Sequence, residues 1–438
     1  MGRIKISIIG AGSGCFSLGI VRDICMSGRL GGSTVSFMDI DSQRLDAVYT
    51  LCKRYAEEMG ADLKIEATTN RRQSLAGADF VISTALAAGH DRLKQGWKIA
   101  LKHGFRFPGS YHILYDEAFW VNYYQLKLME AVTEDILDIC PRAWHLMVMN
   151  PVVAGTTHLL RKYPQAKMVG LCHGYAEVYS IANDIGIGRD NMKYQMCGVN
   201  HFVWLTHLHQ NGEDMLPKLY NAANGSDDPR KRLYSLFGVH PVGDTASWTG
   251  ALWPWWNNPQ GADPDFWQDD PNESSRAWDG YFNFVAKNAE DIKKYAYDPA
   301  VKVTEIYPPK TDDELIIPLV ESIACDIPRV FIVNTQNTYE FVPGIPKDFE
   351  VEIPALCSGM GIQGIQTGGL PKQVLLHTLR DRVVPVEMEL EAFTRGSRDL
   401  LIQLILMDKY CASVGQARDF LEEILALPYH GEMREHYQ

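Results

Sequence analysis

Three polar segments of the sequence carry side chains that can bind a metal ion or a sugar hydroxyl. Asn150 follows the apolar run MVM, Cys172 follows the run MVGL, and His201 stands in CGVNHFVWL. Thiolate sulfur and imidazole nitrogen are common ligands of divalent transition metals. If the apolar runs are strands of a doubly wound sheet, their carboxyl ends lie along one ligand-binding crevice. Cys172 and His201 are therefore candidates to share one divalent cation. The alternative is two structural residues, because separated Cys and His pairs arise by chance in a chain of this length.

A glycine-rich turn near the N-terminus has the composition of a dinucleotide-binding loop. Gly10, Gly12 and Gly14 stand in IIGAGSGCF, and Cys15 occupies the position of the third glycine of the usual fingerprint. Glycines let the backbone approach a pyrophosphate at the N-terminus of the following helix. Asp39 ends the next apolar run, where a carboxylate binds ribose hydroxyls and favours NAD over NADP. A plain turn without a ligand is the alternative. We predict that NAD is bound by Gly10, Gly12, Ser13, Gly14, Asp39 and Thr84.

An alternation of strands and helices must position these residues. Apolar and β-branched runs predict strands over 3–9, 34–39, 63–67, 80–85, 144–149 and 167–171, and apolar periodicity predicts helices over 16–26, 41–59 and 126–139. Such alternation is typical of a parallel sheet covered by helices. Beyond about residue 196, further strands are expected over 202–207, 330–333 and 349–353, and helices from residue 372 onward. We predict an α/β fold, with a Rossmann-like doubly wound parallel sheet over 1–195 and a second, mixed α+β catalytic and oligomerisation domain over 196–438.

Composition excludes several classes of protein. The 438 residues include 42 Lys and Arg against 54 Asp and Glu, a net charge of −12, which argues against binding nucleic acid or anionic lipid. No apolar run approaches the roughly 20 residues of a membrane span. The first residues lead into the glycine turn and not into a cleavage site, so we expect a cytoplasmic protein without a signal peptide. The nine cysteines include no CxxC pair and are expected to be mostly free thiols.

Several motifs together resemble family 4 of the glycoside hydrolases. They are IIGAGSG, MNPV at Asn150, CHGY at Cys172, GVNHFVWL around His201, FGVHPVGDT around Asp244, and EEILALP near the C-terminus. The resemblance covers nearly the whole chain. It implies an NAD-dependent glycosidase with a Mn²⁺-type site at Cys172 and His201, whose coordination is completed by substrate hydroxyls. It also implies a homodimer or homotetramer.

The resemblance implies roles for further residues. Asn150 and Asn200 are expected to bind the sugar, and Asp116 and Asp244 are expected to take part in catalysis, with a helix cap or a turn as the alternative for either Asp. His173, which follows the metal cysteine, is a further candidate proton donor, and a structural core imidazole is its alternative. The reaction implied is oxidation at sugar carbon 3, loss of the proton at carbon 2, elimination of the aglycone, addition of water and return of the hydride. Two proton carriers are required, one at carbon 2 and one at the leaving oxygen. In some relatives the carbon 2 base is a tyrosine, and the sequence offers Tyr111, Tyr115 and Tyr234 without favouring one of them.

The sugar class is indicated only by the residues around the metal cysteine. The sequence Cys-His-Gly-Tyr, ending at Tyr175, resembles the α-uronidase branch and α-galacturonidases in particular. A uronate needs a cation, for which Arg92 and Arg106 are candidates, although both are equally well explained as surface residues. Ser247 replaces an arginine found in some α-glucosidase relatives. Alternatives are an α-glucosidase, α-galactosidase or α-glucuronidase of the same family, or an NAD-dependent dehydrogenase of a polyol or sugar acid.

Overall fold

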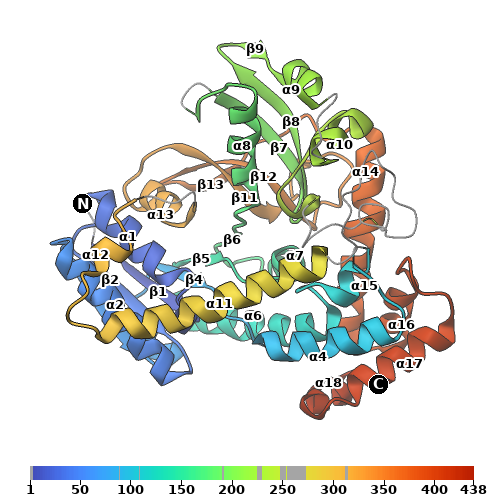
Figure 1. Ribbon diagram of the computed structural model, residues 1–438, viewed down its shortest axis with the longest axis horizontal. Coiled ribbons are helices and arrows are strands. Elements are labelled where there is room, and N and C mark those ends of the chain that lie inside the picture. Colours follow the sequence, from blue (N-terminus) through green and yellow to red (C-terminus); the bar gives the residue numbers. More distant parts are fainter. Residues whose placement is uncertain are drawn as a thin grey trace.

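The computed structural model describes residues 3–87, 89–107, 109–189, 192–223, 229–246, 253, 273–310 and 314–438. It confirms the predicted α/β class (Figure 1). Six parallel strands lie in the order β3-β2-β1-β4-β5-β6, which is that of a doubly wound dinucleotide-binding sheet. Their bounds are β1 Lys5–Ile9, β2 Ser33–Met38, β3 Leu63–Thr68, β4 Phe80–Ser83, β5 Trp144–Met147 and β6 Met168–Gly170.

The remaining strands extend the same sheet in antiparallel fashion beyond β6. The order continues β11-β12-β7-β8-β10, and β13 and β9 pair with β12 and β8. The bounds are β7 Met192–Val199, β8 Phe202–Gln210, β9 Glu213–Asp214, β10 His240–Val242, β11 Arg329–Gln336, β12 Glu350–Ser358 and β13 Gly361–Gly364. Both predicted domains therefore contribute to one sheet, and the predicted boundary between residues 195 and 196 falls inside β7.

Helices cover the parallel strands and form most of the C-terminal part. In the first half they are α1 Ser17–Ser27, α2 Ser42–Glu58, α3 Arg71–Leu75, α4 Gly89–Lys102, α5 Tyr111–Leu114, α6 Phe119–Ile139, α7 Val152–Lys162 and α8 Glu177–Asp184. In the second half they are α9 Leu216–Ala223, α10 Pro229–Phe237, α11 Glu273–Tyr297, α12 Val303–Ile306, α13 Ile316–Ala324, α14 Lys372–Thr378, α15 Val384–Arg395, α16 Arg398–Leu406, α17 Val414–Leu425 and α18 Gly431–His436. No helix in these described ranges is long and apolar enough to cross a bilayer.

The helix boundaries follow local chemistry. Asp41 caps α2, because its carboxylate accepts the backbone N–H groups of Gln43 and Arg44, each at 3.0 Å. Helix α6 begins at Phe119, seven residues before the predicted start at 126. Its first turns, FWVNYY, are buried on nearly every side, so they lack the amphipathic period on which the prediction depended.

The tryptophan-rich segment contributes partly to the core. Trp253 and Trp278 are buried, and Trp278 packs edge-on against Trp97 at 5.3 Å between ring centroids. Trp248, Trp255, Trp256 and Ser247, which also belong to this segment, lie outside the described residues.

Two narrow seams join the antiparallel strands to the rest of the sheet. Strand β6 meets β11 at one residue pair, Gly170 and Asn334, and β7 meets β12 at Gly198 and Glu352. A Cβ atom at Gly170 would lie 2.9 Å from Cβ of Asn334, so glycine permits this close approach. The seams place the polar side chains of Asn334 and Glu352 inside the sheet, next to the ends of β6 and β7.

Candidate active site

The glycine turn has the geometry of a dinucleotide-binding loop. Gly10 has a φ of +90°, and a Cβ atom there would lie 2.6 Å from the backbone of Ala85. Gly12 donates its N–H to Asp39 Oδ2 at 2.9 Å, which holds the carboxylate against the turn. The Thr84 hydroxyl donates to the carbonyl of Gly10 at 3.2 Å. The bare backbone, the N-terminus of α1 and a carboxylate after β2 fit the pyrophosphate and ribose of NAD.

Helix α11 packs over this turn. A Cβ atom at Gly14 would meet the Ile292 side chain at 2.1 Å, and the amide of Asn288 lies 4.0 Å from the Cys15 sulfur. In Figure 1, α11 runs from beside α2 across the parallel strands towards α7. A side chain at position 14 would require the Ile292 side chain to move and a left-handed backbone at φ +70°, so Gly14 also serves the packing of α11.

Cys172 and His201 are brought into contact at the end of β6. The thiol of Cys172 and the ring of His201 are hydrogen-bonded, and Gly174 donates its N–H to the Cys172 sulfur at 3.4 Å. Asp244 Oδ2 lies 3.5 Å from His201 Nε2. Burial, followed by the nearby carboxyl of Glu352, raises the pKa of the Cys172 thiol. A bound cation would oppose that effect, because it stabilises the thiolate.

Two glycines allow Asp244 to reach this pair. Asp244 lies in the short 3-10 turn Gly243–Thr245, and Gly174 begins the 3-10 turn Gly174–Ala176 after Cys172. A Cβ atom at Gly243, whose φ is +60°, would lie 2.7 Å from Cα of Gly174. The two turns therefore touch backbone to backbone, which carries Asp244 towards Cys172 and His201.

His201 occupies an unusual backbone conformation. Asn200 and His201 form the two-residue loop between β7 and β8, and His201 has a φ of +59°, in the region that favours glycine. Arg382 holds the loop, since its Nε donates to the carbonyl of Asn200 at 3.1 Å. A left-handed residue is required by tight two-residue hairpin loops, and non-glycine residues in this conformation also occur at ligand-binding sites.

A buried network surrounds the far side of the His201 ring. Glu117 Oε1 lies 2.7 Å from His201 Nδ1, and Glu117 Oε2 accepts from Arg382 Nη2 at 2.6 Å. The Tyr111 hydroxyl lies 2.9 Å from the same Nδ1 and also donates to Glu117 at 3.2 Å. Burial alone would raise the pKa of Glu117, but Arg382 and His201 hold it well below its usual range. The carboxylate keeps the ring proton on Nδ1, which leaves Nε2 facing Asp244.

Asp116 and Asn150 form a second cluster. Asn150 Nδ2 donates to Asp116 Oδ2 at 2.9 Å, so the segment before α6 meets the end of β5. Burial, together with the charge of neighbouring Glu117, raises the pKa of Asp116 to about 6. A carboxyl group with such a pKa can gain or lose a proton near neutral pH, as a proton carrier must.

Asn200 binds buried carboxyl groups. Its backbone N–H donates to Glu350 at 3.1 Å and its side chain donates to Glu352 Oε2 at 3.0 Å. The Asn334 amide, turned to face these acceptors, donates to the same two residues. Burial raises the pKa of Glu352 to about 7, and burial followed by the charge of Glu352 raises the pKa of Glu350 well above its usual range. The predicted sugar-binding role of Asn200 thus competes with a structural one.

The other predicted site residues make different contacts. His173 Nδ1 lies 3.2 Å from Glu314 Oε1, and the half-exposed ring lies in one cleft with Asp244. The guanidinium of Arg92 lies over the rings of Tyr124 and Tyr429, and Arg106 donates to the carbonyls of Leu101 and Phe105. Arg92, on α4, and Arg106, just after α4, are thus both engaged by neighbouring groups of the protein.

Of the three tyrosines considered as bases, Tyr111 contacts His201 through its hydroxyl. Tyr115 is buried and stacks on Tyr111 at 4.7 Å between centroids. Tyr234 lies in α10, edge-on to Tyr220 at 5.8 Å. Burial, then the charge of Glu117, raises the pKa of Tyr111.

Sequence reasoning missed Glu117, Arg382, Glu350 and Glu352. Glu117 stands beside Asp116 in an acidic pair, a weak signal for a buried role. Arg382 lies far along the chain in a helical segment that looks exposed from its pattern, RDRV. In the structure, Leu379–Val383 is a π-helical turn between α14 and α15. Such turns often occur at functional sites.

Comparison with known proteins agrees with this geometry. The model of the family 4 glycosyl hydrolases matches residues 5–186, and that of the family's C-terminal domain matches residues 196–411. The α-glucosidase of Erwinia rhapontici is 24% identical over 92% of this chain and 93% of its own. The α-galactosidase of Bacillus subtilis is 23% identical over 95% of each.

Solved structures share the whole fold. A 6-phospho-α-glucosidase from gut microorganisms, in complex with NAD and Mn²⁺, superimposes with a TM-score of 0.79 at 17% identity and covers 98% of both chains. The 6-phospho-β-glucosidase of Thermotoga maritima, with manganese, NAD⁺ and glucose 6-phosphate, gives 0.77 at 18% identity over 99% of both. Since the two family models together span most of the sequence, the chain belongs to family 4 of the glycosyl hydrolases.

Proposed function

We propose that this glycosidase depends on NAD and Mn²⁺ and hydrolyses α-uronides, with α-galacturonides as the preferred class. The observation that carries the proposal is the convergence of Cys172, His201 and Asp244 at the end of β6, beside the pair formed by Asp116 and Asn150. These residues lie along the carboxyl edge of the sheet that also carries the glycine turn, where doubly wound folds bind their ligands.

The proposed cation would be held by Cys172 and His201, with Asn150 close by to orient a sugar hydroxyl. In the ranges that the structure describes, no three His, Cys, Asp or Glu side chains are arranged as a complete ligand set. Oxygen atoms of the substrate would therefore complete the coordination, as in catalytic sites that keep positions open. The ligand thiolate would make the enzyme sensitive to oxidation.

The cofactor would lie on the glycine turn, with its ribose at Asp39. When bound, nicotinamide supplies a hydride acceptor and the divalent cation supplies a Lewis acid. The protein must supply two proton carriers, one at carbon 2 of the sugar and one at the leaving oxygen. We assign these tasks to Asp116, which is bonded to Asn150, and to Asp244, which lies 3.5 Å from His201 Nε2. His173, on the rim of the cleft beside Asp244, is kept as a third candidate.

The α-anomer and the uronate rest on separate arguments. The α-glucosidase and α-galactosidase named above are relatives that act on α-linked sugars. A cleft of about 650 Å³ contains Asp244, His173 and Arg189. The Arg189 guanidinium lies 4.2 Å from the centre of the Tyr179 ring, which holds it on the cleft wall. Because Arg189 lines the cleft that contains Asp244, and Arg92 and Arg106 do not, we assign Arg189, in place of those two, to the sugar carboxylate.

A panel of aryl glycosides tests the proposed function. We expect hydrolysis of an aryl α-galacturonide that requires Mn²⁺, NAD and a reductant, without accumulation of NADH. Arg189→Gln should raise KM for the galacturonide and leave KM for an aryl α-galactoside unchanged. Turnover restricted to neutral or phosphorylated α-glycosides would overturn the uronide assignment. Steady NADH production from a free sugar acid would favour a dehydrogenase. The expected assembly is a homodimer or homotetramer in the cytoplasm, which sedimentation and fractionation can check.

A further inference from the structure

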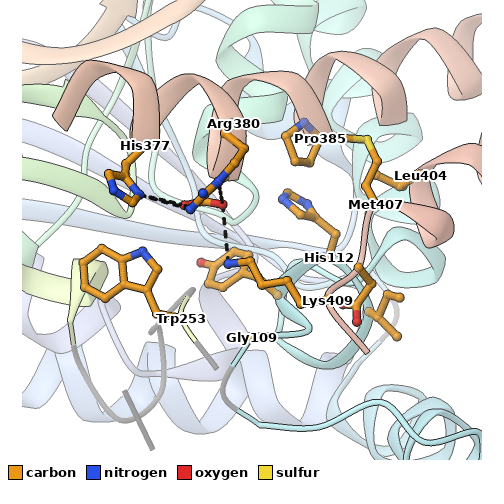
Figure 2. A pocket seen from close by; sticks show the side chains of 13 residues that line it. Gly109, His112, Trp253, His377, Arg380, Pro385, Leu404, Met407 and Lys409 are labelled. Atoms are coloured by element: carbon orange, nitrogen blue, oxygen red, sulfur yellow. Dashed lines mark hydrogen bonds and ion pairs between the residues drawn. The ribbon is translucent and has the colours of Figure 1, made fainter. Parts of the chain in front are cut away.

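A second cavity lies behind Tyr111, away from Cys172. Its volume is about 790 Å³, within the range of small-molecule sites. It is enclosed by α5, the π-helical turn Leu379–Val383, the start of α15 and the end of α16 (Figure 2). Tyr111 separates the cavity from the proposed metal pair, because the residue lines the cavity while its hydroxyl contacts His201 and Glu117. The cavity is therefore distinct from the cleft that contains Asp244.

One side of the cavity carries positive groups. Arg380 is 62% exposed and Lys409 33% exposed, whereas Asp381, to which both are paired, is only 4% exposed. The carboxylate thus lies behind the cations, and the His377 ring lies 3.5 Å from it on the same side. Arg380 directs Nε and Nη2 to Asp381, at 2.8 and 2.7 Å, and Nη2 also to His377 Nδ1 at 3.0 Å, so Nη1 is the guanidinium nitrogen without a bonded partner among the residues that the structure describes. Figure 2 shows His377, Arg380 and Lys409 grouped together.

The opposite side of the cavity is apolar. Pro385, Leu404 and Met407 form it together with Ile113, and Figure 2 shows the first three apart from the cationic group. Asp408 also lines the cavity, but it accepts hydrogen bonds from the Ser110 hydroxyl at 3.0 Å and the Tyr410 N–H at 2.8 Å. Both acids that line the cavity are therefore engaged by the protein, and the exposed charge is positive.

We propose that this cavity is a second binding site, for an organic anion with an apolar body and one carboxylate or phosphate group. The anionic group pairs with Arg380 and Lys409, and the apolar body covers Leu404 and Met407. Charge-assisted hydrogen bonds to a guanidinium give the site its selectivity for anions, and burial of apolar area gives affinity. The site needs neither the cation nor the cofactor of the proposed reaction.

Calorimetric titration of the full chain in metal-free buffer tests the proposal. The probes are benzoate and phenyl phosphate. The controls are inorganic phosphate, which lacks the apolar body, and benzyl alcohol, which lacks the charge. We expect one site per chain for benzoate or phenyl phosphate, and binding at least about tenfold weaker for both controls. The tighter of the two probes identifies the head group. Equal binding of the controls, or no binding of either probe, would overturn the proposal.

Variants locate the binding. Arg380→Gln should weaken it at least about tenfold, and Met407→Trp, which fills the cavity, should abolish it. Arg395→Gln, an exposed arginine of α15 at 67% exposure, is the matched control and should bind as the unaltered chain does. Cys172→Ser should also bind normally, so the result is independent of the proposed glycosidase activity. If Cys172→Ser fails to bind the probe, or if Arg380→Gln and Met407→Trp both still bind it, the probe binds outside this cavity and the proposal is wrong.

Discussion

Substitution of Glu117 by Gln tests the network that orients His201. Glu117 is 1% exposed and accepts from both His201 and Arg382. The isosteric amide keeps the volume but removes the negative charge. The amide offers one acceptor oxygen in place of two, so it cannot accept from both His201 Nδ1 and Arg382, and Arg382 becomes a buried cation without its carboxylate.

The structure sets the size of the two expected effects. Removing one partner of a buried ion pair destabilises a protein by about 3–5 kcal/mol, and Arg382 is 0% exposed, so the upper part of this range applies. Loss of the carboxylate behind a ligating histidine lowers metal affinity by about 10–100-fold. We therefore expect Glu117→Gln to show both losses together.

Urea unfolding followed by tryptophan fluorescence measures the first effect, and electron paramagnetic resonance of free Mn²⁺ measures the second. Glu389→Gln is the matched control. Glu389 is also a buried carboxyl, 2% exposed, and its oxygen accepts from Asn122 at 2.7 Å. The same Asn122 amide donates to the backbone carbonyl of Glu117, so the control lies near Glu117 but does not replace the carboxylate that contacts His201. The control should lose some stability and keep its affinity for Mn²⁺.

A double variant distinguishes the effect of the unpaired Arg382 charge on stability from the effect of Glu117 on the orientation of His201. Glu117→Gln with Arg382→Met removes both buried charges, so stability should recover by a large part of the loss, while Mn²⁺ affinity should stay low. Unchanged affinity for Mn²⁺ in the well-folded Glu117→Gln variant would refute the reasoning, because His201 would then need no carboxylate behind it.

Two further substitutions probe the site. Because the pKa of Asp116 is raised from 3.8 to about 6, its protonated form contributes stability that is complete below pH 3.8 and lost as pH rises through 6. The stability of Asp116→Asn, measured by urea titration, should therefore rise relative to that of the unaltered chain between pH 4.5 and 7.5, by at most about 3 kcal/mol. A difference in unfolding free energy between the two proteins that stays the same over this pH range would contradict the prediction. Gly243→Ala should destabilise by more than the roughly 1–2 kcal/mol of a left-handed alanine, since its Cβ would meet Gly174, and should lower Mn²⁺ affinity. Gly60→Ala, at φ +63° with open space around it, is the control, and equal losses in the two variants would count against the backbone contact.

The parts of the fold that depend on local pattern were predictable from sequence. The strand at Lys5–Ile9, the glycine turn and Asp39 belong to one short stretch whose composition determines its geometry. Helix α6 was predicted too short, because its first turns are buried on all sides and the period of burial disappears. Long-range packing leaves no such local pattern.

The same distinction applies to the candidate site. Cys172, His201 and Asn150 were found because their residue types suggest chemistry and they follow apolar runs. Arg382 was missed because it acts through its contact with Glu117, a residue more than 260 positions away in the chain. Arg92 and Arg106 were selected by charge and position, whereas their contacts are with aromatic rings and backbone carbonyls. Those contacts depend on how the helices pack, which cannot be predicted from the local sequence.

The central claim is that Cys172 and His201 bind one divalent cation beside the cofactor cleft. Addition of Co²⁺ to the reduced protein tests it directly, since a cobalt–thiolate bond produces a charge-transfer absorption band in the near ultraviolet. The band should appear in the unaltered chain and in Cys325→Ser, a half-buried free cysteine that serves as control. It should be absent from Cys172→Ser and weakened in His201→Gln. A band of full intensity in Cys172→Ser would contradict the claim.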